Sequence, residues 1–222
     1  MLSAVIFDVD GTLVDSVDFH AAAWQKAFEQ FGHRFDLRDI RGQIGKGGDQ
    51  LLSVFLDERE IESRGEEIED YRTALFKREY RPLVRGFSGS RPLLDRLRSD
   101  GIKVALGSSA KGDELKYYRK VAEIQDLDLV ETSSDDAERS KPHPDIFQAA
   151  LKRLDLPAEQ CVVVGDTPYD AEAAGKAGLR TTGVLCGGFA EADLRAAGAD
   201  LIFVGPADLL NRYEWWLEEL GR

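Results

Sequence analysis

Two pairs of closely spaced carboxylates are the residues of this chain best suited to chemistry. Asp8 and Asp10 end a short apolar stretch and precede Gly11, while Asp166 and Asp170 follow the most apolar run of the sequence. Taken alone, each pair has an ordinary structural explanation, because Asp and Gly favour turns and Asp caps helices. Taken together, the pairs could hold a hard cation between them.

Two further segments carry groups that bind anions. Ser108 and Ser109 follow a second apolar stretch, and their hydroxyls could bind an anion or cap the next helix. Lys141 stands before a Pro-His-Pro sequence whose prolines stiffen the backbone just ahead of a helical pattern. A transferring phosphoryl group needs its oxygens neutralised. Lys141 would supply charge for this, and Ser108 and the backbone N–H groups near Val9 and Ser109 would supply donors.

All four segments follow apolar stretches, and this shared position suggests one site. In open α/β sheets, ligands bind beyond the carboxyl ends of the strands. Asp8 and Asp166 at neighbouring strand ends would repel each other unless a cation lay between them. Oxygen ligands without a nearby cluster of Cys or His suit Mg²⁺, which accepts one or two carboxylates and keeps several waters. The sequence therefore predicts a magnesium site that binds a phosphoryl group.

The elements that must position these groups are short apolar strands alternating with helices. The predicted strands are Ala4–Val9, Ile102–Gly107, Asp128–Thr132, Cys161–Gly165, Thr181–Leu185 and Leu201–Val204. They show little alternation, as expected for strands covered on both faces. Helical spacing of apolar residues lies between them, with a Gly near several helix ends. The pattern predicts an α/β fold with a parallel, Rossmann-like sheet and helices on both faces.

One segment departs from this alternation. Residues 16–83 show helical patterns only, beginning with Phe19, Ala23 and Ala27, and the stretch Asp57–Tyr71 is heavily charged, as for a solvated helix face. We therefore expect a catalytic core formed by residues 1–15 and 84–222, with residues 16–83 inserted after the first strand as a separate helical unit.

Composition narrows the classes of partner. The 222 residues are 43% hydrophobic and 32% charged, values ordinary for a globular protein, and the formal charge of −12 argues against a nucleic-acid partner. No run of apolar residues is long enough to span a membrane, and no signal-peptide pattern opens the sequence. Cys161 and Cys186 are expected to be reduced thiols. We therefore expect a cytoplasmic protein whose partner is a small phosphorylated metabolite, without an obligate protein partner.

With these four motifs in order, the sequence resembles the haloacid dehalogenase-like superfamily, in the helical-cap branch related to phosphoglycolate phosphatase and β-phosphoglucomutase. The resemblance covers the whole chain. It implies that Asp8 is the nucleophile that becomes phosphorylated, and that Asp10 is the general acid and base, with its backbone carbonyl on Mg²⁺. It also implies that Ser108 and Lys141 bind the phosphoryl group. Asp166 corresponds to the acidic metal ligand, and Asp170 to a further carboxylate that ligates directly or supports the site.

Among the chemistries of that superfamily, a phosphatase acting through an aspartyl-phosphate fits the residues best. Dehalogenases lack the metal and the second acid, and phosphonatases replace Asp10 by a small residue. The alternative is a sugar-phosphate mutase of the β-phosphoglucomutase type, which the segment from Phe19 to Trp24 resembles. That branch carries an arginine in a cap loop, and Gly48 stands at the matching position here.

The cap residues that could set specificity are His20, Lys46 and Gly47. Lys46 could replace the mutase arginine only as a point charge, without its bidentate grip. His20 could contact the substrate, or could equally pack locally on its helix. Glycines on both sides of Lys46 are typical of a mobile loop and also of a plain flexible turn.

Overall fold

Six strands form one parallel sheet in the computed structural model, which describes residues 2–221. The strands are β1 (Ala4–Phe7), β4 (Lys103–Gly107), β5 (Val130–Thr132), β6 (Cys161–Gly165), β7 (Arg180–Val184) and β8 (Ala199–Phe203). Their order is β5-β4-β1-β6-β7-β8, and every neighbouring pair is parallel. The chain runs from β1 outward to β5 and then returns to the other side of β1. The strand order therefore reverses at β1, where open sheets bind their ligands.

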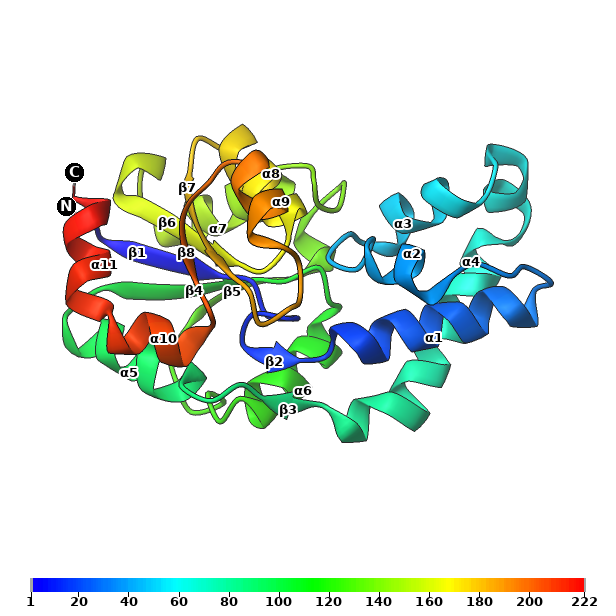
Figure 1. Cartoon of the computed structure of the whole chain (residues 1–222), viewed down its shortest axis with the longest axis horizontal. Coiled ribbons are helices and arrows are strands. Elements are labelled where there is room, and N and C mark those ends of the chain that lie inside the picture. The colour runs from blue at the N-terminus through cyan, green and yellow to red at the C-terminus, as the bar shows by residue number, and fades with distance from the viewer. Residues whose placement is uncertain (1, 222) are drawn as a thin grey trace.

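Helices cover both faces of the sheet, which confirms the predicted α/β class (Figure 1). The helices of this part are α5 (Ser90–Ser99), α6 (Gly112–Val121), α7 (Asp145–Leu154), α8 (Pro168–Lys176), α9 (Glu191–Ala196), α10 (Pro206–Asn211) and α11 (Tyr213–Leu220), with the short turns η3 (Ser134–Asp136) and η4 (Ala158–Gln160). The core forms because successive residues of a strand point to opposite faces. Ile6 of β1 packs in one apolar cluster with Phe147 of α7, and Phe7 packs in another with Leu94 of α5 and Trp216 of α11.

A second part of the molecule is helical and lies beyond the carboxyl edge of the sheet (Figure 1). It consists of α1 (Val17–Gln30), α2 (Leu37–Arg41), α3 (Gly48–Phe55), α4 (Glu58–Leu75) and the short turns η1 (Phe76–Tyr80) and η2 (Arg81–Leu83). Trp24, Phe28 and Ile68 lie in its own apolar cluster. Only Gly65, Ile68 and Leu75 of α4 are buried, so the charged stretch that contains α4 is a solvated helix face as expected.

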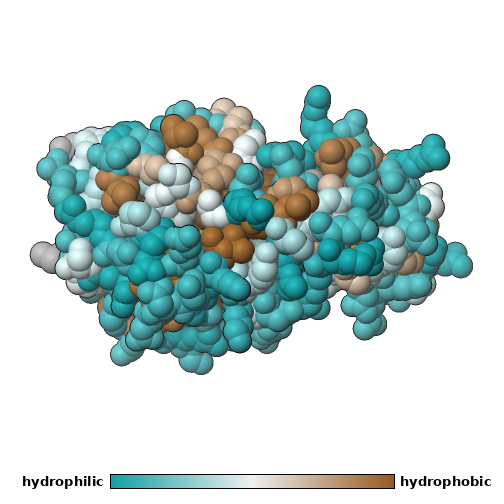
Figure 2. All heavy atoms as spheres, turned by 90° about the horizontal axis from the view of Figure 1, so that it is seen from below, coloured by the Kyte–Doolittle hydropathy of each residue, from teal (hydrophilic) through white to brown (hydrophobic). Residues whose placement is uncertain are grey.

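A short antiparallel ribbon joins the two ends of this helical segment, and the sequence pattern did not predict it. Val14 of β2 (Val14–Asp15) pairs with Gly86 of β3 (Arg85–Gly86), and Asp15 pairs with Arg85. Strands of two residues are too short to show a hydrophobic period. Figure 2 shows the surface from below: it is mostly hydrophilic, and apolar side chains gather toward the middle of this face.

Two expectations from composition concern the membrane and the cysteines. Within residues 2–221, none of the helices combines the length and the hydropathy needed to cross a membrane. Cys161 is buried, Cys186 is partly buried, and both are free thiols, as the sequence predicted.

Candidate active site

Three carboxylates meet at the carboxyl edge of the sheet. Asp8 follows β1, and Asp166 follows the neighbouring strand β6, which pairs with β1 in register. Asp170 lies one turn further on, in the first turn of α8. One carboxylate oxygen from each of the three lies within 4.8 Å of the others, and all three side chains are buried. The structure therefore brings together the two halves of the site that the sequence predicted.

The ammonium group of Lys141 lies inside this cluster. The side chain is 1% exposed, and Nζ donates to Oδ1 of Asp8 at 2.5 Å and to the carbonyl of Gly107 at 3.0 Å. Nζ also lies 2.7 Å from Oδ1 of Asp170. Burial alone would lower the pKa of Lys141, but the two carboxylates raise it above its ordinary value. Lys141 is therefore a fixed positive charge beside Asp8.

One lysine does not compensate three buried carboxylates. Burial raises the pKa of Asp8 to about 7 despite the attraction of Lys141, and the repulsion of Asp170 and Asp10 adds to this effect. Burial also raises the pKa of Asp166, and repulsion by Asp8 and Asp170 acts in the same direction. Clustered carboxylates with such raised pKa values are typical of a place that a cation completes.

The surroundings of Asp166 fit a hard cation. Its Oδ1 accepts a hydrogen bond from Oγ1 of Thr12 at 2.9 Å, whereas its Oδ2 is buried and has no hydrogen-bond partner within residues 2–221. A buried carboxylate oxygen without a donor is costly unless another group binds it. Asp8 and Asp166 supply oxygen ligands of the kind that Mg²⁺ prefers. The residues present therefore fit a magnesium ion.

Two glycines make room for this carboxylate. A Cβ atom at Gly11 would lie 2.3 Å from Oδ2 of Asp166, and one at Gly187 would lie 1.7 Å from the same atom. Gly11 belongs to the motif seen in the sequence and has a φ of 76°, which favours glycine. Gly187, which follows β7, was missed because a lone glycine in a loop carries no chemical signal.

Asp170 has two sets of contacts. Its Oδ2 accepts from Oγ1 of Thr167 at 2.7 Å, and Thr167 in turn caps the first turn of α8. Its other oxygen faces Lys141. Asp170 is buried, and its carboxylate therefore contacts both the start of α8 and Lys141.

Asp10 lies outside the carboxylate cluster and faces the helical segment. Its Oδ1 accepts from Oγ of Ser16 at 2.5 Å and lies 2.9 Å from Nε2 of His20. Burial would raise the pKa of Asp10, but the contacts with His20, Ser16 and Tyr118 outweigh burial and lower it. Asp10 is therefore ionised in the free protein at neutral pH.

The orientation of His20 is fixed from both sides of its ring. Its Nδ1 lies 2.8 Å from a guanidinium nitrogen of Arg72, and its Nε2 lies 2.9 Å from the hydroxyl of Tyr118 as well as near Asp10. Arginine can only donate, so Nδ1 accepts and the proton of a neutral His20 stands on Nε2. The ring is buried and stacks on Phe76 at a centroid distance of 4.0 Å.

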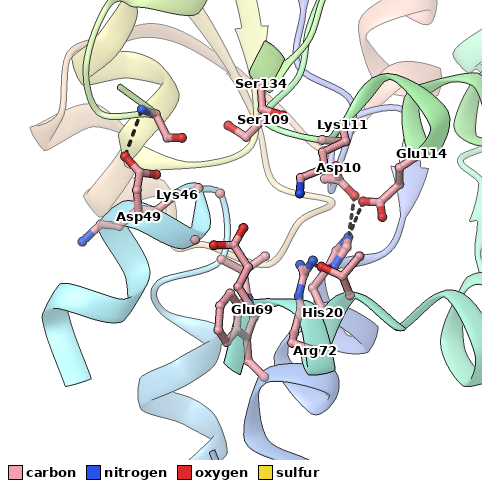
Figure 3. Close-up of a pocket in the computed structure, with 18 of the residues that line it drawn as sticks. Asp10, His20, Lys46, Asp49, Glu69, Arg72, Ser109, Lys111, Glu114 and Ser134 are labelled. Carbon is pink, nitrogen blue, oxygen red and sulfur yellow. Dashed lines mark hydrogen bonds and ion pairs between the residues drawn. The ribbon is translucent and has the colours of Figure 1, made fainter. Parts of the chain in front are cut away.

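The serines and the cap residues lie around a cavity of about 340 Å³, which Figure 3 shows in close-up. Ser109 lines the cavity, whereas Oγ of the buried Ser108 accepts from the backbone N–H of Ala110 at 3.1 Å. Lys46 and Gly47 line the opposite wall. A Cβ atom at Gly47 would lie 2.0 Å from Oγ of Ser140, so glycine there permits close contact between the helical segment and the core.

The parallel sheet and the carboxylate cluster at its edge define an α/β protein with an acidic site that fits a cation, and comparison with known proteins supplies the family. Residues 5–184 match the family described as haloacid dehalogenase-like hydrolase. The chain belongs to this haloacid dehalogenase-like hydrolase family.

Several relatives resemble the chain over nearly its whole length. Beta-phosphoglucomutase of Bacillus subtilis is 30% identical over 96% of both chains, and the phosphorylated carbohydrates phosphatase of Thermotoga maritima is 28% identical over 95% of this chain and 97% of its own length. The crystal structure of a hydrolase from Pseudomonas syringae superposes with a TM-score of 0.89 at 30% identity, covering 97% of this chain and 99% of that one. The chain also matches the Arabidopsis thaliana protein SUPPRESSOR OF QUENCHING 1, chloroplastic, at 30% identity, but it spans only 19% of that protein's length.

Proposed function

We propose that this protein is a Mg²⁺-dependent phosphatase that hydrolyses a small phosphorylated metabolite through an aspartyl-phosphate on Asp8. The observation that carries the proposal is that Asp8 lies beside Lys141 and Asp166, whereas Asp10 is held outside this cluster by Ser16 and His20. The proposed nucleophile and the proposed proton carrier thus lie in two different environments. One raises the pKa of Asp8, and the other lowers the pKa of Asp10. Such a separation is typical of paired acids with different roles.

In the first step, an oxygen of Asp8 attacks phosphorus and displaces the alcohol of the substrate. Lys141 and the hydroxyls of Ser108 and Ser109 hold the phosphoryl oxygens, and Lys141 also neutralises part of their charge. Asp8, Asp166 and the carbonyl of Asp10 would hold the Mg²⁺ ion, which would supply further positive charge. When the phosphoryl dianion binds, it raises the pKa of Asp10, which takes up a proton from water and then donates it to the leaving oxygen. Asp170 keeps Lys141 in place from the other side.

In the second step, water attacks the phosphorus of the aspartyl-phosphate and regenerates Asp8. Asp10 is now ionised, because its proton has left with the alcohol, and it accepts a proton from the attacking water. A carboxylate nucleophile replaces one difficult displacement by two easier ones. His20 orients Asp10 in both steps through its Nε2–H group.

We also propose that residues 16–83 form a cap that closes over the site. Three contacts between the helical segment and the core support this role. Arg41 donates to the carbonyl of Gly187 at 2.9 Å, the hydroxyl of Tyr169 donates to the carbonyl of Gly42 at 2.5 Å, and Asp49 accepts from the backbone N–H of Ser140 at 3.3 Å. A closed cap would exclude bulk water from the phosphoryl transfer.

The second candidate is a sugar-phosphate mutase, which the 30% identity to beta-phosphoglucomutase favours. A mutase must bind a second phosphate in its cap while it excludes water. Here the loop 44–50 has Lys46 as its only cation, and Nζ of Lys46 donates to Oε1 of Gln43 at 2.7 Å and lies 4.7 Å from the ring centre of Tyr169. The carboxylate of Glu69 lies against Gly48. Because Lys46 is held within its own surroundings and a carboxylate lies beside Gly48, the loop is poorly suited to a second phosphate, and these contacts favour the hydrolase.

The experiment that separates the two functions follows both products from β-glucose 1-phosphate in the presence of Mg²⁺ and a trace of the 1,6-bisphosphate. Release of inorganic phosphate ahead of glucose 6-phosphate supports the phosphatase. Accumulation of glucose 6-phosphate well ahead of inorganic phosphate would refute the phosphatase proposal in favour of the mutase. Hydrolysis of p-nitrophenyl phosphate with and without EDTA tests whether the chain turns over at all.

A further inference from the structure

Glu69 is a carboxylate on the cap side of the cavity that the proposed mechanism does not use. It belongs to α4, is only partly exposed, and reaches into the cavity opposite Ser109 and Lys111 (Figure 3). Within residues 2–221, neither a hydrogen bond nor an ion pair joins Glu69 to another side chain. The neighbouring charges of the cavity show what such a free carboxylate could bind.

The cations on the same wall are already engaged. Arg72 donates to His20 and lies over the ring of Trp24 at 5.2 Å, and Lys77 pairs with Asp113 at 2.8 Å. Lys46 is bound to Gln43, and burial lowers its pKa. Of these cations only Lys77 is neutralised by a carboxylate, whereas Arg72 and Lys46 contact neutral groups. Glu69 is a carboxylate of the same wall without a partner among the described residues.

The cavity as a whole is acidic outside the catalytic pair. Beside Asp8 and Asp10, its lining contains six carboxylates (Asp49, Glu69, Asp113, Glu114, Asp135 and Glu138) and four cations (Lys46, Arg72, Lys77 and Lys111). Lys111 lies on the core side near Asp10, where the phosphoryl group would bind (Figure 3). A second phosphate or a carboxylate on the leaving group would meet like charge on the cap side, which costs binding free energy.

The position of Glu69 depends on a glycine. A Cβ atom at Gly48 would lie 2.6 Å from Cδ of Glu69 and less than 3 Å from both of its oxygens, so the carboxylate uses the space that glycine leaves there. Gly48 begins α3, and the N-terminal end of a helix stabilises negative charge. The carboxylate of Glu69 therefore stands at the N-terminal end of α3, where its oxygens can accept hydrogen bonds.

We propose that Glu69 determines which leaving group the substrate carries. The favoured leaving group is a neutral, hydroxyl-bearing alcohol whose O–H group donates to Glu69, and a leaving group with a second phosphate or a carboxylate is disfavoured. This inference rests on the proposed phosphatase function. It adds that the substrates are monophosphate esters of polyhydroxylated compounds. An acceptor that substrate binding covers without giving it a donor discriminates strongly between substrates that differ by one hydroxyl.

The test compares three esters in the full-length protein with Mg²⁺: glucose 6-phosphate, which offers hydroxyls; 2-phosphoglycolate, which offers a carboxylate; and p-nitrophenyl phosphate, which offers neither. The variants are Glu69→Gln, which removes the charge and keeps the shape, and Glu69→Ala, which removes the acceptor. Asp70→Asn is the matched control, because Asp70 is the next acid of α4 and is exposed. Circular dichroism and melting temperature show that each variant is folded.

We expect the wild type to prefer glucose 6-phosphate to 2-phosphoglycolate. In Glu69→Gln, the ratio of the two kcat/KM values should fall about tenfold, as for loss of a hydrogen bond to a charged group. In Glu69→Ala the ratio should fall further, and p-nitrophenyl phosphate should change less than about twofold in both variants. Asp70→Asn should behave as the wild type.

Three results would overturn the inference. One is an unchanged ratio in both Glu69 variants, and another is a wild type that prefers 2-phosphoglycolate. The third is an equal fall for all three esters, because a specificity residue must separate them. If the wild type hydrolyses p-nitrophenyl phosphate while Asp8→Asn does not, these results concern Glu69 alone. A wild type that hydrolyses none of the esters instead overturns the phosphatase proposal and the inference with it.

Discussion

Nε2 of His20 lies 2.9 Å from Oδ1 of Asp10, so a residue of the helical segment contacts the carboxylate that we propose as the proton carrier. Arg72, also from the helical segment, fixes the other ring nitrogen. The hydroxyl of Tyr118, from the core, lies beside Nε2 and donates to Glu114 at 3.2 Å. The state of Asp10 therefore depends on how the helical segment sits against the core.

The first prediction concerns this contact. His20→Ala removes a donor to ionised Asp10, so the pKa of Asp10 should rise and the acidic limb of the kcat–pH profile should move to higher pH. We expect kcat at neutral pH to fall about tenfold, less than the roughly 10²- to 10⁴-fold contribution of general acid–base catalysis itself. His33→Ala is the control, since His33 pairs with Glu60 away from Asp10. An acidic limb that stays in place would contradict the positioning role.

The second prediction concerns the nucleophile. Asp8→Asn keeps the shape of the side chain but removes the attacking oxyanion, so kcat should fall by at least about a thousandfold while the protein still folds. Asp128→Asn, an exposed acid remote from the site, should retain full turnover. Activity of Asp8→Asn within about tenfold of wild type corresponds to only about 1.4 kcal/mol of barrier and would refute the mechanism.

The third prediction concerns stability without metal. The folded protein raises the pKa of Asp8 from 3.8 to about 7 because burial disfavours the ionised form. Between these two values the folded state holds more protons than the unfolded chain, so stability falls as the pH rises. In EDTA, the contribution of Asp8 should therefore make the Tm lower at pH 8 than at pH 5.5. A loss of about 1 kcal/mol in the free energy of unfolding corresponds to a fall in Tm of about 2–4 °C.

Mg²⁺ should reverse this loss, and its stabilising effect should grow with pH because the carboxylates must be deprotonated to bind it. Asp8→Asn should weaken the dependence of Tm on pH in EDTA. Equal Mg²⁺ stabilisation at both pH values would show that the cation does not bind at the carboxylate cluster. Thermal denaturation followed by circular dichroism measures all of these quantities.

The fourth prediction uses the close contact at Gly187. A methyl group there would lie 1.7 Å from Oδ2 of Asp166, so Gly187→Ala should displace that carboxylate and weaken Mg²⁺ binding by about tenfold or more, the scale seen for disturbed ligand support. Gly175→Ala is the matched control: a methyl group added there would point into open space, and alanine favours the helix. Calorimetric titration with Mg²⁺ separates the two variants. Equal affinities would exclude Asp166 as a ligand.

The sequence indicated that the core residues of the site would lie together because Asp8 and Asp166 each directly follow a strand and Lys141 lies in the segment after β5. Asp8, Asp166 and Lys141 converge once parallel strands are assumed, since the carboxyl ends of such strands share one edge. Arg72 and Tyr118 were missed. They come from the middle of helices, where an Arg or a Tyr at ordinary helical spacing gives no sign that it faces a histidine or a carboxylate far away in the chain.

The same lack of signal within helices and loops explains why the sequence left the roles of the cap residues open. His20 was found as a candidate with two equal explanations, and the structure shows local packing on Phe76 together with contact to Asp10. Lys46 lines the cavity, but its ammonium group is bound within its own loop. Glu69 lay in a charged stretch that was interpreted as a solvated helix face, but its side chain lines the cavity and lies close to Gly48.

The ribbon of β2 and β3 places the two ends of the helical segment next to each other, with Val14 opposite Gly86. A segment that leaves and re-enters the core at one point can be exchanged as a unit, because its replacement needs only two matching ends. Helical segments from relatives could therefore be grafted at this ribbon onto the same sheet. In such chimaeras, the carboxylates of the core would stay constant while the walls that select the leaving group are inherited from the donor.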